Sequence, residues 1–224
     1  MAAIIGGALL LVGSFMLIGP KPGMQYATII GLTAYFMTTI WAGRRLITDF
    51  PHSRLGLCNL ATLGRLVIVG ILFVALLEGL HPTWSTFGLA ILALSLDGVD
   101  GWLARKEGLA SKFGARFDVE VDAAFALVLA ISAAVNDVVG SYVVLLGLPY
   151  YLFGAAKAFL PWLNQPLPDR FSRKAVCVFQ IAALIALQAP FFTDGRLDLV
   201  VAAVTVALIW SFGRDIIWLW RKFK

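Results

Sequence analysis

Leu96-Asp-Gly-Val-Asp-Gly-Trp-Leu-Ala-Arg105 and Gly114-Ala-Arg-Phe-Asp-Val-Glu-Val-Asp122 decide how this chain folds, because each places acidic residues beside a long apolar stretch. The four aspartates are Asp97, Asp100, Asp118 and Asp122. A carboxylate at membrane depth costs roughly 2.5–3.5 kcal/mol, so such a cluster is expected to have a counter-charge and a function. Hard oxygen ligands suit Mg²⁺, Mn²⁺ or Ca²⁺. The two segments therefore predict a metal site in a membrane protein.

The composition of the 224 residues indicates an integral membrane protein. Hydrophobic residues make up 60% of the chain and charged residues 14%, whereas a soluble domain has about 25% charged residues. The apolar stretches are long and do not alternate, which favours helices over a β-barrel. The net charge of +5 does not suggest a nucleic-acid partner, because the basic residues lie at the ends of the apolar stretches.

The apolar stretches predict an all-α, polytopic bundle of membrane helices. Eight of them can be marked, at residues 3–19, 26–43, 62–80, 84–104, 117–136, 139–160, 174–191 and 198–219. The first lacks the basic start and cleavage site of a signal peptide, so we interpret it as a span. Residues 49–61 predict a short amphipathic helix on the inner membrane surface.

The basic residues predict the orientation of the bundle. With both termini in the cytoplasm, sixteen of the 18 Lys and Arg residues face inward, and only Lys21 and Arg196 face outward. Such a bias is typical of cytoplasmic loops. We therefore expect the acidic cluster to face the cytoplasm, in a bacterial-type inner membrane.

The spacing of the aspartates predicts that they converge. Asp97 and Asp100 share one helix face, and Asp118 and Asp122 share a face of the next helix. An antiparallel pair of helices would bring all four together, with Arg105 placed to bind a phosphate. Two metals held by shared carboxylates can neutralise a pyrophosphate. Asp122 lies furthest along its helix, so we expect it to act as the base for an acceptor hydroxyl, or also as a metal ligand.

The same residues form a recognisable pattern, Asp-x2-Asp-Gly-x2-Ala-Arg-x8-Gly-x3-Asp-x3-Asp. It is met in full at Asp97, Asp100, Gly101, Ala104, Arg105, Gly114, Asp118 and Asp122. This pattern resembles the signature of the CDP-alcohol phosphatidyltransferases. Upstream, Asn59-Leu-Ala-Thr-Leu-Gly-Arg65 is similar to the Asn-x2-Thr-x2-Arg element of that family, with Cys58 where a proline often stands.

The resemblance implies a six-helix core at residues 62–219 behind the surface helix. Residues 49–224 would then form the catalytic domain, and residues 1–48 two extra N-terminal spans. It also implies a site for Mg²⁺ or Mn²⁺, with two ions, and a homodimer. The metal would bind to Asp97, Asp100 and Asp118, with Asp122 as a further ligand or the base. The CDP site would include Asn59, Thr62, Gly101, Ala104, Arg105 and Gly114.

The expected reaction belongs to phospholipid biosynthesis. The phosphatidyl group of CDP-diacylglycerol would pass to a hydroxyl acceptor, such as glycerol 3-phosphate or an inositol phosphate, and CMP would be released. One alternative is transfer of a phosphoalcohol from a soluble CDP-alcohol to a lipid hydroxyl. A different alternative is a divalent-cation transporter, but its site would be expected near the bilayer midplane.

A second basic cluster surrounds the 161–173 loop. It comprises Lys157, Arg170, Arg173 and Lys174. These residues either lie beside anionic headgroups, as inner-surface cations do, or bind the phosphate of a phosphorylated acceptor. Glu120 points away from the aspartates on either side of it, so we expect it to pair with Arg116 or another helix, or to face water.

Overall fold

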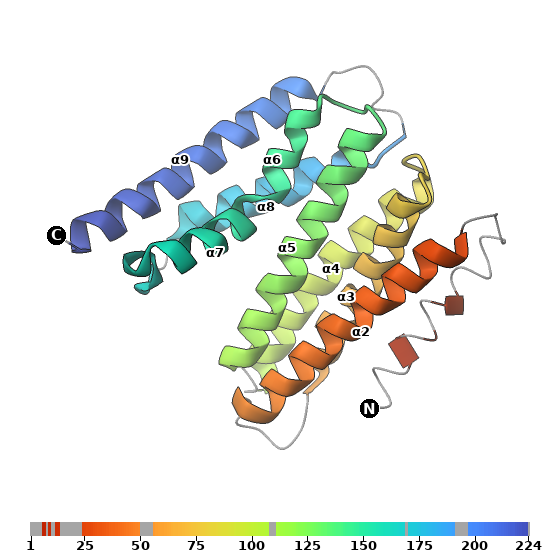
Figure 1. The fold of residues 1–224 in the computed structure, drawn as a ribbon, viewed down its shortest axis with the longest axis horizontal. Coiled ribbons are helices and arrows are strands. Elements are labelled where there is room, and N and C mark those ends of the chain that lie inside the picture. The colour runs from red at the N-terminus through yellow and green to blue at the C-terminus, as the bar shows by residue number, and fades with distance from the viewer. Residues whose placement is uncertain are drawn as a thin grey trace.

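The structure is a computed structural model, and it is a bundle of long helices (Figure 1). It describes residues 6, 7, 9, 12, 13, 24–49, 56–107, 111–168, 170–190 and 197–223. Within these residues the regular secondary structure is entirely helical, as the sequence predicts. The predicted span at 3–19 lies mostly outside the described residues.

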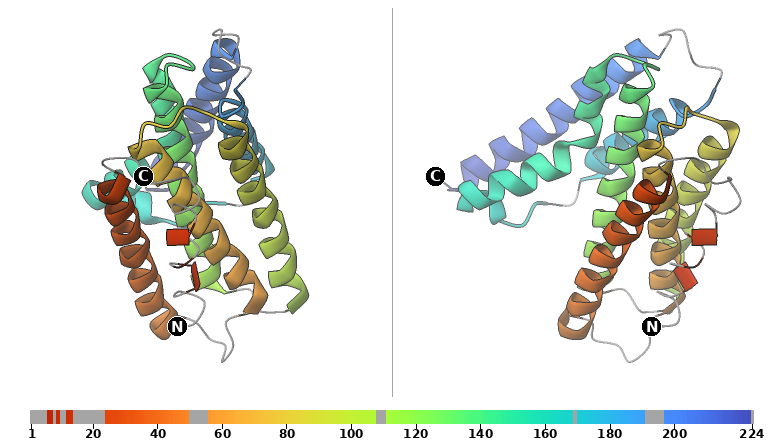
Figure 2. Two further views of the ribbon diagram at one scale, coloured as in Figure 1. Left: turned by 90° about the vertical axis from the view of Figure 1, so that its right-hand side faces the viewer. Right: turned by 45° about the vertical axis from the view of Figure 1, so that its right-hand side comes forward.

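Four helices form one group, which positions the acidic residues. They are α2 (Met24–Asp49), α3 (Gly56–Leu77), α4 (Trp84–Glu107) and α5 (Lys112–Val135). Helix α3 packs against α2, α4 and α5, and all four run side by side in the views of Figures 1 and 2. Because α4 and α5 are antiparallel, the C-terminal end of one lies beside the N-terminal end of the other.

The second group contains the rest of the chain. Its elements are the short turn η1 (Ser141–Val143), α6 (Val144–Gly147), α7 (Pro149–Phe159), η2 (Pro161–Asn164), α8 (Phe171–Ala186) and α9 (Asp198–Phe223). Helix α8 packs against α9 and also against α4 and α5. The C-terminal ends of α7 and α9 diverge from the first group (Figure 1). The buried residues of α8 are in its C-terminal half, and Gln188 just after the helix donates to the carbonyl of Leu129 on α5. The C-terminal half of α8 thus joins the two groups.

Local chemistry explains where the central helices begin and end. Ser111 caps α5: its hydroxyl accepts a hydrogen bond from the backbone N–H of Gly114 at 3.0 Å, which satisfies a donor of the first turn. Helix α5 therefore starts five residues before the predicted stretch at 117–136. Gly79 has φ +64° and ends α3. Its N–H and that of Leu80 bond back to carbonyls of the last turn, as in a Schellman motif.

The predicted span at 139–160 is broken at Pro149. Helices α6 and α7 meet there at 61°, because proline lacks an N–H and its ring clashes with the preceding turn. The amide of Gln180 on α8 donates to the carbonyl of Leu146 at 2.5 Å. This bond satisfies one backbone acceptor that the break leaves free.

The structure confirms a membrane-type helical bundle but not the number of spans. Three described helices are long and apolar enough to cross a bilayer, namely α3, α4 and α9, and the α6–α7 pair gives a fourth if it counts as one span. Helices α8 and α5 are not among these candidates. Helix α8 has 16 residues, which give a length of about 24 Å, shorter than a hydrocarbon core of about 30 Å. Helix α5 is long, but five of its first eleven residues are charged.

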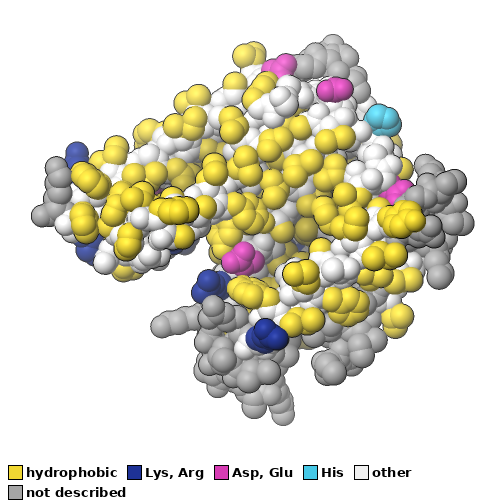
Figure 3. Space-filling model, viewed as in Figure 1, with side chains coloured by type: hydrophobic (Ala, Val, Ile, Leu, Met, Phe, Trp, Pro, Cys, Tyr) yellow, Lys and Arg dark blue, Asp and Glu magenta, His cyan; other side chains and the backbone are white. Residues whose placement is uncertain are grey.

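The predicted surface helix at 49–61 differs from the structure in its second half. Residues 56–61 form the first turns of α3 and continue directly into the predicted core span. The face of the molecule drawn in Figure 3 is largely hydrophobic. Its few charged side chains lie at the margins and in the hollow between the two groups of helices. Such a surface suits a bilayer, where exposed apolar side chains meet lipid rather than water.

Candidate active site

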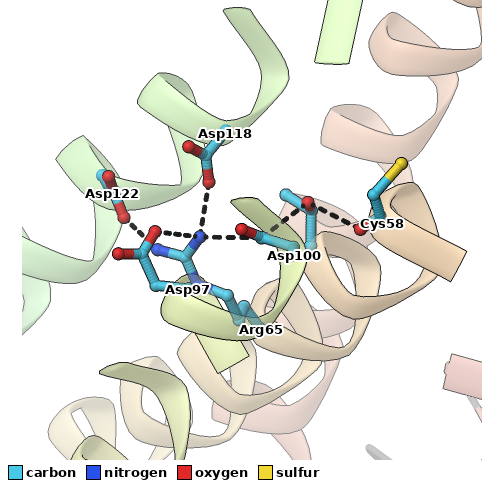
Figure 4. A network of polar contacts seen from close by, with 7 residues as sticks. Cys58, Arg65, Asp97, Asp100, Asp118 and Asp122 are labelled. Atoms are coloured by element: carbon cyan, nitrogen blue, oxygen red, sulfur yellow. Dashed lines mark hydrogen bonds and ion pairs between the residues drawn. The ribbon is translucent and has the colours of Figure 1, made fainter. Parts of the chain in front are cut away.

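Arg65 on α3 lies at the centre of the acidic cluster (Figure 4). Its side chain is only 2% exposed. Asp97 and Asp100 reach it from α4, and Asp118 and Asp122 reach it from α5. The predicted convergence of the four aspartates is therefore present in the structure, and it is organised around a buried cation.

The guanidinium of Arg65 contacts all four carboxylates. Nη1 donates to Oδ2 of Asp100 at 3.3 Å and to Oδ1 of Asp118 at 2.5 Å. Nη1 also lies 2.8 Å from Oδ1 of Asp97, and Nη2 donates to Oδ1 of Asp122. Since Nη1 has two protons, Asp100 and Asp118 use both, and Asp97 is held by charge alone.

The electrostatic balance of the cluster is strongly negative. Four ionised carboxylates and one guanidinium give a formal charge of −4 + 1 = −3. The side chain of Asp100 is 7% exposed, whereas those of Asp97, Asp118 and Asp122 are 33–41% exposed. The cluster is thus closed on the α3 side and open on the other, where a cation or a polar substrate can enter.

Thr62 and Asn59 support the cluster from the preceding turns of α3. The hydroxyl of Thr62 lies 3.0 Å from Oδ2 of Asp100 and 3.2 Å from the carbonyl oxygen of Cys58. Asn59 is buried, and its Oδ1 would lie 3.2 Å from a Cβ placed on Gly114. The absence of a side chain at Gly114 therefore allows α3 and α5 to approach closely beside the aspartates.

The donor set fits a divalent metal. Asp97, Asp100 and Asp118 each offer an oxygen, and these oxygens lie within 4.8 Å of one another. In an octahedral Mg²⁺ site opposite ligands are about 4.2 Å apart and neighbouring ligands about 2.9 Å, so the three carboxylates would have to move closer together. Nη1 of Arg65, which lies 2.5–3.3 Å from an oxygen of each of them, would have to move aside. Asp122 is outside this set of three but shares Arg65 with it. Two divalent ions would change the formal charge from −3 to about +1, which suits a pyrophosphate.

Three further predicted residues lie on the last turns of α4. Gly101, Ala104 and Arg105 belong to this helix, as the motif predicts. The side chains of Ala104 and Arg105 lie outside the part of the chain that the structure describes. Their predicted contacts with CDP stay predictions.

The second basic cluster is only partly assembled. Nη1 of Arg173 donates to Oδ2 of Asp215 at 3.1 Å, and Nη1 of Arg170 lies 3.5 Å from Oδ1 of the same residue. Lys174 is exposed on α8. Lys157 is on α7, where its Nζ lies 4.9 Å from the ring centroid of Phe153. The two arginines thus form a pair, and the two lysines lie to either side of it in the sequence.

Glu120 pairs with another helix, which is one of the three environments predicted for it. Its Oε1 accepts a hydrogen bond from the hydroxyl of Tyr150 at 2.7 Å. This contact links α5 to α7 just after the break at Pro149. Glu120 is therefore a link between helices and is not among the described residues that could form the metal cluster.

Two residues of the structure are more important than their place in the sequence indicates. Arg65 entered only as the end of the upstream motif, although its position three residues after Thr62 places both on one helix face. Asp215 was not singled out, although an acid in the apolar stretch 198–219 is a signal of the same kind as the aspartate cluster.

Comparison with known proteins agrees with this site. The sequence model of the CDP-alcohol phosphatidyltransferase family matches residues 55–213. Neither the curated proteins nor the solved structures give a match. Enzymes of this family transfer a phosphatidyl or phosphoalcohol group from a CDP-alcohol, and they generally depend on a divalent metal. The match covers more than half of the chain and includes every residue of the acidic cluster, and the chain therefore belongs to the CDP-alcohol phosphatidyltransferase family.

Proposed function

We propose that this protein transfers the phosphatidyl group of CDP-diacylglycerol to an alcohol acceptor and releases CMP. The observation that carries the proposal is the convergence of Asp97, Asp100, Asp118 and Asp122 on Arg65. Such a cluster at the end of two membrane helices suits a substrate whose pyrophosphate lies at the membrane surface and whose acyl chains stay in the bilayer.

The metal ligands would be Asp97, Asp100, Asp118 and Asp122, in a site for two Mg²⁺ or Mn²⁺ ions. When bound, these ions would neutralise the pyrophosphate and stabilise the charge that develops on the departing CMP. The proposal is supported by the oxygen spacing of the first three carboxylates. Arg65 would keep the carboxylates together before the ions bind, because a buried cation offsets their mutual repulsion.

Asp122 is the proposed general base. Its side chain is 41% exposed, more than those of the other three aspartates, so it is open to an incoming acceptor. One carboxylate oxygen would take the proton of the acceptor hydroxyl as the hydroxyl oxygen attacks the phosphorus of the phosphatidyl group. The bond from that phosphorus to the bridging oxygen breaks, and the oxygen leaves with CMP.

CDP would bind beside the ends of α3, α4 and α5. Asn59, Thr62, Gly101 and Gly114 are proposed to border this site, with Ala104 and Arg105 at the end of α4. The close approach of Asn59 to the Gly114 backbone supports this placement. Residues 49–224 would then be the catalytic domain, and residues 1–48 an N-terminal addition outside the matched region.

A phosphorylated acceptor suits the second basic cluster. Arg170 and Arg173 lie at the start of α8, which packs against α4 and α5. The thiol of Cys177, one turn further along α8, interacts electrostatically with both Asp122 and Arg173. We therefore assign this cluster, with Lys174 nearest in sequence and Lys157 on α7, to the phosphate of an acceptor such as glycerol 3-phosphate or an inositol phosphate.

The basic residues also support an orientation with the active site facing the cytoplasm, in a membrane of the bacterial inner type. The family resemblance leads us to propose a homodimer, which light scattering of the solubilised protein would test.

Membrane lipids would surround the bundle, and no nucleic acid is expected as a partner. The cation-transporter alternative predicts metal flux in vesicles, which the proposed enzyme would not produce.

The experiment that tests the proposal is CMP release from CDP-diacylglycerol with Mg²⁺ or Mn²⁺ over a panel of acceptors. The panel contains glycerol 3-phosphate, inositol 1-phosphate, inositol, serine and phosphatidylglycerol. Release with one phosphorylated acceptor is the expected result. Release only from a soluble CDP-alcohol, with diacylglycerol as acceptor, would instead support the alternative donor.

A further inference from the structure

Asp215 is a buried carboxylate that no part of the acidic cluster uses. It lies on α9 and is only 3% exposed. Its Oδ2 accepts a hydrogen bond from Arg173 at 3.1 Å, and its Oδ1 lies 3.5 Å from Nη1 of Arg170 but accepts no hydrogen bond from the described residues. A carboxylate is costly to bury unless it is paired. Asp215 and the two arginines are therefore one unit that joins α8 to α9.

The unit contains more positive charge than a link between helices requires. One carboxylate and two guanidiniums leave a formal charge of +1, although one arginine would suffice for the link. Arg173 is fixed at a second point, because its Nη2 donates to the carbonyl of Pro168 at 3.0 Å. The side chains of Arg170 and Arg173 are nevertheless 23% and 28% exposed.

The remaining donors of the pair can reach an anion. Each guanidinium has five N–H donors in a planar fork, a geometry that matches the oxygens of a phosphate. The contacts with Asp215 and Pro168 use only a few of these donors. The first turn of α8 lies at the same point, and the N-terminal end of a helix favours negative charge.

We propose that Asp215 is a positioning residue: it holds Arg170 and Arg173 side by side so that both bind the phosphate of a phosphorylated acceptor. This inference rests on the proposed function. A carboxylate between two guanidiniums reduces their mutual repulsion and restricts both side chains to one arrangement. The ordering of these two long side chains is thus complete before the acceptor arrives, which improves acceptor affinity.

The test is Asp215→Asn in the full-length protein, assayed for CMP release with CDP-diacylglycerol and glycerol 3-phosphate. Asparagine keeps the shape of the side chain and removes its charge. We expect the KM for glycerol 3-phosphate to rise about tenfold, while kcat and the KM for CDP-diacylglycerol stay within about twofold. Asp198→Asn is the matched control, because Asp198 is also on α9 and accepts a hydrogen bond from Tyr142. It should change neither KM.

A second variant separates positioning from a structural link. Arg170→Gln leaves the hydrogen bond between Arg173 and Asp215 in place, and it should also raise the KM for glycerol 3-phosphate. If both variants lower only the melting temperature and leave that KM unchanged, Asp215 is merely a link between α8 and α9, and the inference is overturned.

The inference can fail separately from the proposed function. CMP release with inositol or serine alone would overturn the role of Asp215 but leave phosphatidyl transfer intact. If CDP-diacylglycerol yields no CMP with any acceptor, the proposed function fails, and inorganic phosphate becomes the probe. Phosphate that raises the melting temperature of the wild type, but not of Asp215→Asn, would then support positioning, and an equal effect on both would contradict it.

Discussion

Replacement of Arg65 by methionine tests how the acidic cluster is held together. Methionine keeps much of the side-chain length and removes the cation. Removing one partner of a buried ion pair costs about 3–5 kcal/mol, because the other charge is left uncompensated. Three of the four carboxylates are about one-third exposed or more, so water compensates part of this loss. We therefore expect a destabilisation of about 3 kcal/mol at neutral pH without metal.

The assay is thermal unfolding of the solubilised protein, in EDTA and in Mg²⁺ or Mn²⁺. At about 2–4 °C per kcal/mol for a chain of this size, Arg65→Met should unfold about 6–12 °C below the wild type in EDTA. A divalent metal that binds only the folded cluster stabilises the wild type by about 2.7 kcal/mol at one hundred times its Kd. Arg65→Met should gain more than this at the same metal concentration, because its carboxylates lack a counter-charge that the metal supplies. The difference in melting temperature between the two proteins should therefore narrow when metal is added.

Arg116→Met is the matched control for this experiment. Arg116 is exposed and lies on α5, the helix that carries Asp118 and Asp122, so its loss should change the melting temperature little. Equal melting temperatures of Arg65→Met and the wild type in EDTA would refute the idea that Arg65 compensates the buried carboxylates. A metal effect of the same size in both proteins would refute the idea that a metal takes over this role.

Two other substitutions test the packing around the cluster. Gly114→Ala should lower the melting temperature and raise the KM for CDP-diacylglycerol, because the added Cβ would lie 3.2 Å from Asn59 Oδ1. Overpacking costs about 1–3 kcal/mol, which exceeds the gain in helix propensity of about 1 kcal/mol from alanine. Gly88→Ala, which meets no atom within 4 Å, should be neutral or stabilising, and an equal response of both would contradict the argument. Tyr150→Phe should lower stability by about 1.5–3 kcal/mol, since it removes a hydrogen bond to the charged Glu120. Its kcat should remain close to that of the wild type, and a loss of more than about a hundredfold would indicate that Glu120 belongs to the catalytic site.

The aspartate cluster could be predicted from the sequence because both pairs of aspartates have the spacing of neighbours on a helix face. Spacings of three and four residues fix a common face on each helix, and a short connection makes the helices antiparallel. Arg65 could not be placed in the same way, because it approaches from a third helix. The angle between α3 and the α4–α5 pair depends on packing, for example on the close approach at Gly114. This angle cannot be predicted from any local pattern in the sequence.

The second group of helices was predicted less completely for a related reason. The stretch 139–160 is apolar throughout, so hydropathy gives one span, whereas Pro149 breaks it. The arginines of the 161–173 region could be predicted as a cluster, but their common partner Asp215 lies more than forty residues further along the chain. Contacts of this kind depend on how α8 packs against α9, which periodicity alone does not determine.

The most direct test of the central claim is CMP release from CDP-diacylglycerol by the wild type and by Asp122→Asn in the same lipid vesicles. The wild type should release CMP in Mg²⁺ or Mn²⁺ and stop in EDTA. Asp122→Asn should remain folded and keep part of its metal-dependent rise in melting temperature, because Asp97, Asp100 and Asp118 still offer oxygens to the metal. It should release almost no CMP, because the acceptor hydroxyl loses its base. Equal rates from the two proteins would contradict the account, because the acidic cluster on α4 and α5 would then not be the catalytic centre.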